Sequence, residues 1–127
     1  MNYSQIKIVS IPVSDQQTAL DFYQNTLGFT LIQSYPMSEK ASWIQLAPSS
    51  LSTVSITLVT WFEQMPPGSV CGLVLETNDL EADYQELTQK GVALSPIQTA
   101  PWGKSAMFSD RDGNSWVLQQ SNQKLDL

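Results

Sequence analysis

The alternation of apolar and polar residues along the chain forms a pattern that occurs twice. The runs "IPVSDQQTALDFYQNTLGF" and "VLETNDLEADYQELTQKGV" each contain an apolar strand, polar capping residues, an amphipathic helix, and a glycine followed by apolar residues. Asp15 and Asp79 take equivalent places in the two runs, about half the chain length apart. Because such a repeat marks one supersecondary unit used twice, we predict two similar units that together fill the chain.

Each run carries the signals of a helix start and a helix stop. Ser14 with Gln17 and Asn78 with Glu81 have the spacing of a capping box, so we predict Ser14 and Asn78 as the N-caps. A glycine, the residue that most often follows a helix, stands after each run. The apolar stripes at helical spacing comprise Ala19, Leu20, Phe22, Tyr23 and Leu27 in the first helix, and Leu80, Tyr84 and Leu87 in the second.

Strand-like runs follow each predicted helix, at residues 29–35, 41–47 and 53–61 in the first half and 92–95, 104–109 and 115–120 in the second. With its opening strand, each unit is predicted to be β-α-β-β-β. Pro66, Pro67 and Gly68 favour neither helix nor strand, so they mark a joint. We therefore predict a single domain over residues 1–127, with a first module at 1–62, a joint at 63–69 and a second module at 70–127.

Composition narrows the function classes. The chain is 42% hydrophobic, which suffices for a core, and its pI of about 4.2 argues against a general nucleic-acid binder. With no histidine, it can build neither a Ser-His-Asp triad nor a histidine metal site, and one cysteine allows no internal disulfide. No signal peptide or membrane-length apolar run is evident, so we expect a cytoplasmic protein that engages no membrane.

The first repeated run and the segment "PWGKSAMFSDRDGNSWVLQ" resemble the vicinal oxygen chelate superfamily, also called the glyoxalase/bleomycin resistance/dioxygenase superfamily. The "PWG" and the "D-x-x-GN" spacing are most similar to bleomycin-resistance-type members. The resemblance implies an α+β fold in which two tandem βαβββ modules form a curled, half-open mixed sheet, a cup, with the helices outside. It also implies a homodimer.

The sequence departs from the resemblance at the metal-binding positions. Metal-dependent members carry ligands at four inward positions, which fall here at Ile8, Thr57, Gly72 and Val117. Divalent metals in such sites need imidazole or carboxylate donors, typically from at least three residues, and these positions supply a single hydroxyl. We therefore expect no metal and no cofactor, and we predict no catalytic residue; the metal-dependent glyoxalase and dioxygenase activities are excluded.

In the implied fold, strand alternation decides which residues face the cavity. Ile6, Ile8 and Ser10 are predicted to face inward, whereas Val9, Ile11 and Val13 meet a helix, and Trp116 packs in the core. Trp102 follows Pro101 at the start of a hairpin, where an indole could stack on a flat ligand. The predicted ligand-binding residues are Ile8, Ser10, Trp43, Gln45, Thr57, Trp61, Val74, Glu76, Trp102 and Val117.

These observations lead to one preferred function and two alternatives. The preferred hypothesis is a metal-independent protein that binds a small organic ligand, flat or cationic, and sequesters a drug or metabolite. The first alternative is a metal-free enzyme of lyase or isomerase type that uses a pocket carboxylate, such as Glu76, or a tyrosine. The second is a protein-interaction module with an exposed groove. In each case we expect neither nucleic acid nor membrane as a partner.

Overall fold

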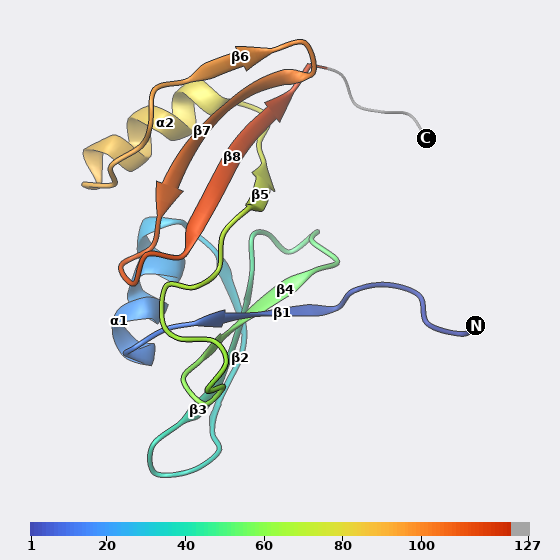
Figure 1. The fold of residues 1–127 in the computed structure, drawn as a ribbon, viewed down its shortest axis with the longest axis vertical. Coiled ribbons are helices and arrows are strands. Elements are labelled where there is room, and N and C mark those ends of the chain that lie inside the picture. Colours follow the sequence, from blue (N-terminus) through green and yellow to red (C-terminus); the bar gives the residue numbers. More distant parts are fainter. Residues whose placement is uncertain (123–127) are drawn as a thin grey trace. The chain divides into compact units, whose positions relative to one another are not determined.

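The computed structural model describes residues 1–122, so residues 123–127 of the predicted second module lie outside the described residues. The chain divides into two compact units, Met1–Ser69 and Val70–Leu127. The elements, coloured along the chain in Figure 1, are β1 (Ile8–Pro12), α1 (Gln16–Asp21), η1 (Phe22–Thr26), β2 (Thr30–Pro36), β3 (Ser42–Ala47), β4 (Ser55–Val59), β5 (Leu73–Glu76), α2 (Leu80–Gln89), β6 (Gln98–Ala100), β7 (Gly103–Ser109) and β8 (Ser115–Ser121). This order confirms the predicted α+β class and its two βαβββ units.

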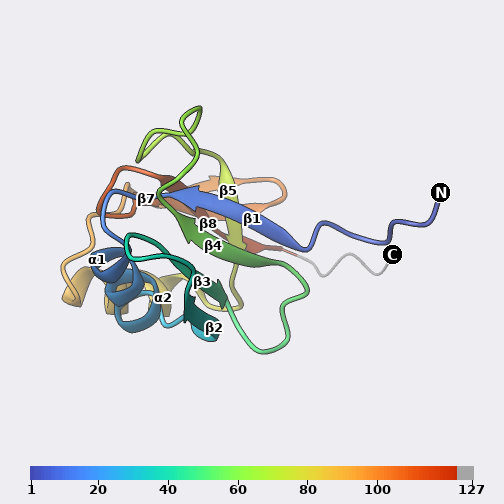
Figure 2. The ribbon, with the colours of Figure 1, turned by 90° about the horizontal axis from the view of Figure 1, so that it is seen from below.

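Each unit contains one four-stranded mixed sheet, ordered β1-β4-β3-β2 in the first and β5-β8-β7-β6 in the second. The opening strand of each unit runs parallel to its last strand, β1 with β4 and β5 with β8, and the other neighbours are antiparallel. Figure 2 shows β1 lying alongside β4. A parallel pair requires a long crossover, which the helix and the two following strands provide. The repeat found in the sequence is therefore a repeat of topology.

One face of the first sheet is mostly apolar, and α1 packs against it. Tyr23 is fully buried, and its ring contacts Phe22 and Phe29 edge-on, with ring centroids 5.4 Å and 5.6 Å apart. Each fully buried aliphatic side chain on this face contributes about 1.5–3 kcal/mol. The strand residues that share this face are Val9, Ile11, Leu31, Ile44, Leu46, Ile56 and Leu58.

The second unit is built in the same way. Leu80 and Leu87 of α2 are buried, as the predicted stripe requires, and Tyr84 donates its hydroxyl hydrogen to the Ser95 carbonyl at 3.1 Å. Trp116 is 3% exposed, which confirms it as a core residue. The other buried apolar residues of this sheet are Ala106, Phe108 and Leu118.

The predicted capping residues are wrong by one position in both helices. Asp15 is the N-cap of α1, and its carboxylate accepts a hydrogen bond from the Thr18 backbone N–H at 2.9 Å. Asp79 caps α2 and accepts from the Ala82 N–H at 3.1 Å. Ser14 and Asn78 also have capping side chains, but the backbone of the following aspartate is non-helical, as an N-cap requires, and the charged acceptor is the stronger. The Thr18 bond also lowers the pKa of the Asp15 carboxyl.

The first helix continues beyond α1 as a π-helical turn, η1, which the sequence pattern does not reveal. The Leu27 N–H donates to the Phe22 carbonyl five residues earlier, at 2.9 Å. Gly28 and Gly91, both with positive φ, end the two helices. Gly28 follows its capping aspartate by one residue more than Gly91 follows Asp79. The wider π turn therefore accommodates one extra residue in the first helix.

The strand predicted at residues 92–95 is not formed, and β6 lies further along the chain at Gln98–Ala100. Ser95 instead makes two isolated bonds to β7: its N–H donates to the Met107 carbonyl at 2.9 Å, and its hydroxyl accepts from the Met107 N–H at 2.8 Å. Pro96 follows directly and has no N–H to continue a ladder, so the strand can only start beyond it.

Candidate functional site

The face of the first sheet opposite α1 differs in chemistry from the apolar one. We call it the polar face and define it by Ile8, Ser10, Gln33, Tyr35, Trp43, Gln45, Ser55 and Thr57, which share one side of the sheet by register. Gln45, Ser55 and Thr57 are nonetheless buried, at 6%, 5% and 1% exposure. Buried polar side chains require hydrogen-bond partners, so their bonds determine what the face can offer a ligand.

Four polar side chains form a row across all four strands. The register aligns Ser10 of β1 with Thr57 of β4, Thr57 with Gln45 of β3, and Gln45 with Gln33 of β2. The Thr57 hydroxyl lies 3.4 Å from the Ser10 hydroxyl, within hydrogen-bonding distance. Neighbouring strands are about 4.8 Å apart, so the row presents hydroxyl and amide groups at regular intervals over about 14 Å.

A directed chain of hydrogen bonds crosses this row. The Trp43 indole Nε1–H donates to Gln45 Oε1 at 3.2 Å, and Gln45 Nε2 donates to Ser55 Oγ at 2.8 Å. The Ser55 hydroxyl then lies 3.3 Å from the Lys7 carbonyl oxygen, to which it donates. Because indole can only donate and a carbonyl can only accept, both ends of the chain fix the orientation of the Gln45 amide.

An aromatic pair lies on the same face. The rings of Tyr35 and Trp43 are stacked, with centroids 6.5 Å apart and planes inclined by 21°. The two residues are register partners on β2 and β3. Tyr35 is 48% exposed, so the pair presents aromatic surface to solvent next to the Gln45 amide. A flat ring system could stack here while its polar atoms reach the amide.

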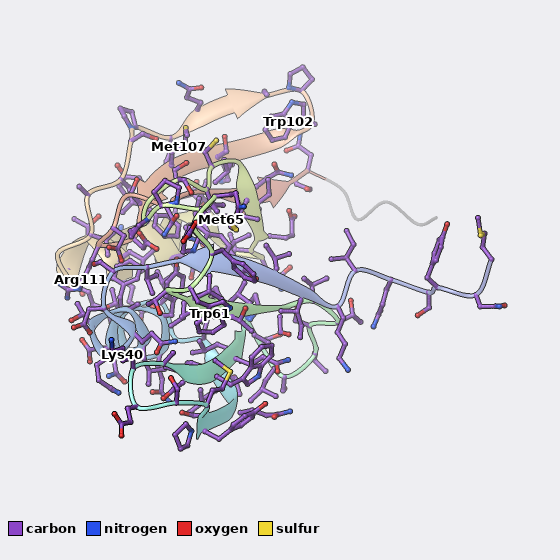
Figure 3. All side chains as sticks on the ribbon, turned by 60° about the horizontal axis from the view of Figure 1, so that its bottom comes forward. Lys40, Trp61, Met65, Trp102, Met107 and Arg111 are labelled. Carbon is purple, nitrogen blue, oxygen red and sulfur yellow. The ribbon has the colours of Figure 1, made fainter. Side chains whose placement is uncertain are left out.

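The structure thus groups five of the ten predicted ligand-binding residues on the polar face: Ile8, Ser10, Trp43, Gln45 and Thr57. Trp61 follows β4 and is 36% exposed, with its ring centroid 6.1 Å from that of Phe62 (Figure 3). Ile6, predicted to face inward, precedes β1 and is 70% exposed, so strand alternation does not determine which way it faces.

The other four predicted residues belong to the second unit. Val74 and Val117 are register partners in β5 and β8, and Val74 is 55% exposed. The Glu76 carboxylate accepts from the Ser121 backbone N–H at 2.9 Å, so its side chain holds the end of the sheet. Trp102 lies in the turn between β6 and β7 and is 54% exposed (Figure 3).

Sequence reasoning missed three residues of the polar face as ligand-binding candidates: Gln33, Tyr35 and Ser55. Ser55 alternates with Thr57 along β4, so alternation alone placed it on this side of the sheet. The side of the sheet on which Tyr35 lies could not be predicted, because the register between β2 and β3 shifts between Leu31 and Gln33. Such a β-bulge moves the following residues to the opposite face from the one that strict alternation predicts.

An ion pair links α2 to β7 in the second unit. Lys104 forms an ion pair with Glu81, and this contact lowers the pKa of the Glu81 carboxyl. Among residues 1–122, no three side chains of cysteine, aspartate or glutamate come together as a group that could hold a metal ion. In that same part of the chain, every helix is too short or too polar to cross a membrane.

Comparison with known proteins identifies the family. Residues 5–118 match the Glyoxalase/Bleomycin resistance protein/Dioxygenase superfamily, and the chain therefore belongs to it. Among individual relatives, the uncharacterized protein YetH of Bacillus subtilis (strain 168) is 32% identical over 91% of this chain and 98% of its own length.

Two solved structures from Streptomyces sp. CB03234 are more similar in sequence. TnmS3, an antibiotic binding protein, is 45% identical, has a TM-score of 0.90, and aligns over 96% of this chain and 99% of its own. A glyoxalase/bleomycin resistance protein is 46% identical, with a TM-score of 0.82, over 91% of this chain and all of its own. One of these relatives is thus a protein described as binding an antibiotic.

Proposed function

We propose that this protein binds a small organic molecule on the polar face without a metal ion and thereby sequesters a drug or metabolite. The observation that carries the proposal is the oriented Gln45 amide beside the Tyr35–Trp43 pair. Such a combination of aromatic surface with a few fixed polar groups is typical of small-molecule sites. The similarity to TnmS3 supports a ligand of antibiotic type.

The chemistry of the polar face favours a flat, uncharged ligand. Its defining residues include no aspartate, glutamate, lysine or arginine, so they would leave a buried ligand charge without a counterion. After its two internal bonds, Gln45 retains one Nε2–H and one Oε1 lone pair that could bind a ligand. A planar molecule with a carbonyl or ring N–H at its edge matches these groups, and this match supports the proposal of an uncharged ligand over a cationic one.

Metal independence rests on the side chains at the four positions where metal-using members carry ligands. Ile8 and Val117 are hydrocarbon, Gly72 has no side chain, and Thr57 is a neutral hydroxyl. Ser10 pairs with Thr57 as Val74 pairs with Val117, which supports the equivalence of Thr57 and Val117 in the two units. These groups do not fit a divalent metal, because they lack imidazole and carboxylate donors.

The remaining proposals concern organisation. We propose that residues 1–127 act as a single two-module domain, that the protein is cytoplasmic, and that it forms a homodimer. Sedimentation velocity at micromolar concentration tests the last point, and we expect a species of twice the 14.1 kDa chain mass. A single species of monomer mass at all concentrations would contradict it.

Calorimetric titration with two matched ring systems tests the binding proposal. Acridone is flat and uncharged, whereas 9-aminoacridine has a similar ring system and is a cation. We expect acridone to bind, and Trp43→Leu to weaken its affinity about tenfold, since loss of a stacking aromatic costs on the order of 1 kcal/mol or more. Trp102→Ala, in the second unit, measures whether that indole also contributes.

The outcomes separate the parts of the proposal. Binding of 9-aminoacridine without acridone would contradict the uncharged class and leave small-molecule binding standing. Acridone affinity that is unchanged in Trp43→Leu would place binding elsewhere. If neither compound nor a wider panel of flat drugs and metabolites bound, the proposed function would be wrong.

A further inference from the structure

The Gln16 side chain joins the first turn of α1 to two strands of the sheet. Its Nε2 donates to the Ser42 carbonyl at 2.7 Å and to the Leu58 carbonyl at 2.8 Å. Its Oε1 accepts from the Ser42 backbone N–H at 3.0 Å. All three bonds go to backbone groups of β3 and β4, and together they use both amide hydrogens.

This amide stands where the direct pairing of β3 with β4 stops. The two strands pair at Gln45–Thr57 and at Leu46–Ile56, and the register holds no pair nearer to Ser42. Gln16 instead bonds to both backbone groups of Ser42 and to the Leu58 carbonyl. A side-chain amide presents the same donor and acceptor types as a backbone peptide, so it can replace a missing rung of the ladder.

The segment that Gln16 holds is the one that carries the aromatic pair. Trp43 follows Ser42 directly on β3, and its indole both stacks on Tyr35 and donates to Gln45. If the start of β3 moved by even a fraction of an ångström, the 3.2 Å contact between Trp43 and Gln45 would lengthen beyond useful hydrogen-bond geometry. The orientation of the polar face therefore depends on an amide that belongs to the helix on the other side of the sheet.

We propose that Gln16 is a positioning residue for the ligand-binding face, acting through Ser42 and Trp43 without touching the ligand. This inference rests on the proposed function for its effect on affinity. Its structural part, the control of the Trp43 position, stands independently. If Gln16 had only a structural role, removing its hydrogen bonds would lower the free energy of unfolding and leave the environment of Trp43 in the folded protein unchanged.

The test compares Gln16→Met with Gln17→Met. Methionine matches the length of glutamine and removes all three bonds, and Gln17 is the exposed neighbour on the same helical turn. The protein is labelled with 5-fluorotryptophan, and the Trp43 fluorine resonance is assigned with Trp43→Phe. We expect Gln16→Met to shift or broaden the Trp43 resonance, to leave that of buried Trp116 in place, and to weaken acridone binding about tenfold. Gln17→Met should change none of these.

The fluorine spectrum decides the inference even if acridone does not bind. An unshifted Trp43 resonance in folded Gln16→Met overturns it, whereas failure of the wild-type protein to bind any flat compound overturns the proposed function instead. If Gln16→Met does not fold, Gln16→Glu replaces it, because the carboxylate keeps an acceptor for the Ser42 N–H and loses both donors. A shifted Trp43 resonance in that variant supports the inference, and an unshifted one contradicts it.

Discussion

Gln45 shows how a single amide can set the chemistry of a whole face. The amide has an accepting oxygen and a donating nitrogen, and its two neighbours need different partners. The Trp43 indole can only donate, so it needs the oxygen. The Ser55 hydroxyl already donates a hydrogen bond to the Lys7 carbonyl, so it accepts one from the nitrogen. Only one orientation of the amide satisfies both contacts. The groups left over, one donor and one lone pair, therefore have a fixed orientation toward the proposed ligand.

Replacing Gln45 with leucine should cost stability as well as affinity. The change leaves the Trp43 N–H without its acceptor and the buried Ser55 hydroxyl without its donor. Unsatisfied buried polar groups cost on the order of 1–3 kcal/mol, so we expect the free energy of unfolding in urea to fall by about that amount. Gln33→Leu, an exposed change in the same row, should stay within about 0.5 kcal/mol of wild type. Equal losses in both variants would argue against the hydrogen-bond chain.

The lowered pKa of Asp15 makes the stability of the protein depend on pH. Its pKa is lowered chiefly by the hydrogen bond from the Thr18 N–H, so the folded state holds the carboxylate form more tightly than the unfolded state does. Its contribution to stability is therefore complete above the unfolded pKa, near 4, and is lost as pH falls through the lowered folded value. Asparagine caps without titrating, so Asp15→Asn should lose less stability than wild type between pH 5 and pH 2.

Urea midpoints measured across that pH range check this expectation. Asp15→Ala serves as the comparison, because it removes both the cap and the charge and should be less stable than Asp15→Asn at neutral pH. A wild-type protein and an Asp15→Asn variant that lose stability in parallel on acidification would contradict the role assigned to the carboxylate.

At the scale of elements, the order of strands and helices could be predicted because the same pattern occurs twice. The exact caps could not, since Ser14 and Asp15 are adjacent and both are good capping residues, so backbone conformation and acceptor strength decide between them. The apolar pattern did not predict the π turn either. Only the comparison of Asp15–Gly28 with Asp79–Gly91 shows that the first helix has one residue more.

That extra residue predicts the result of two single-residue deletions. Removing exposed Gln24 from η1 should let the first helix close with ordinary α-helical bonds, as α2 does, at a cost of about 2 kcal/mol or less. Removing exposed Gln85 from α2 takes out a residue that the helix needs, and it turns Leu87 away from the core. We expect the Gln85 deletion to unfold the second unit, as judged by circular dichroism. Equal tolerance of both deletions would contradict the π-turn interpretation.

At the scale of the whole molecule, alternation along single strands predicted that Ile8, Ser10 and Thr57 share one face, because all three lie on regular strands. It could not predict how they connect. The bond from Gln45 to Ser55 joins two strands, and that from Gln16 to Ser42 joins a helix to a strand, so both depend on tertiary register. Tyr35 was missed for a similar reason, because a bulge in β2 changed which side it faces.

The proposed metal independence belongs to the whole molecule, and it would separate this chain from the metal-using members of its superfamily. If the positions of Ile8, Thr57, Gly72 and Val117 hold no ion, dialysis against EDTA should leave Tm unchanged within about 1 °C and should not alter acridone affinity. A bound metal at a hundred times its Kd would add about 2.7 kcal/mol, enough to raise Tm by several degrees in a domain of this size. Elemental analysis of the purified protein provides the independent check. Stoichiometric zinc, nickel, manganese or iron, lost together with stability on chelation, would overturn metal independence and require donors other than the four equivalent positions.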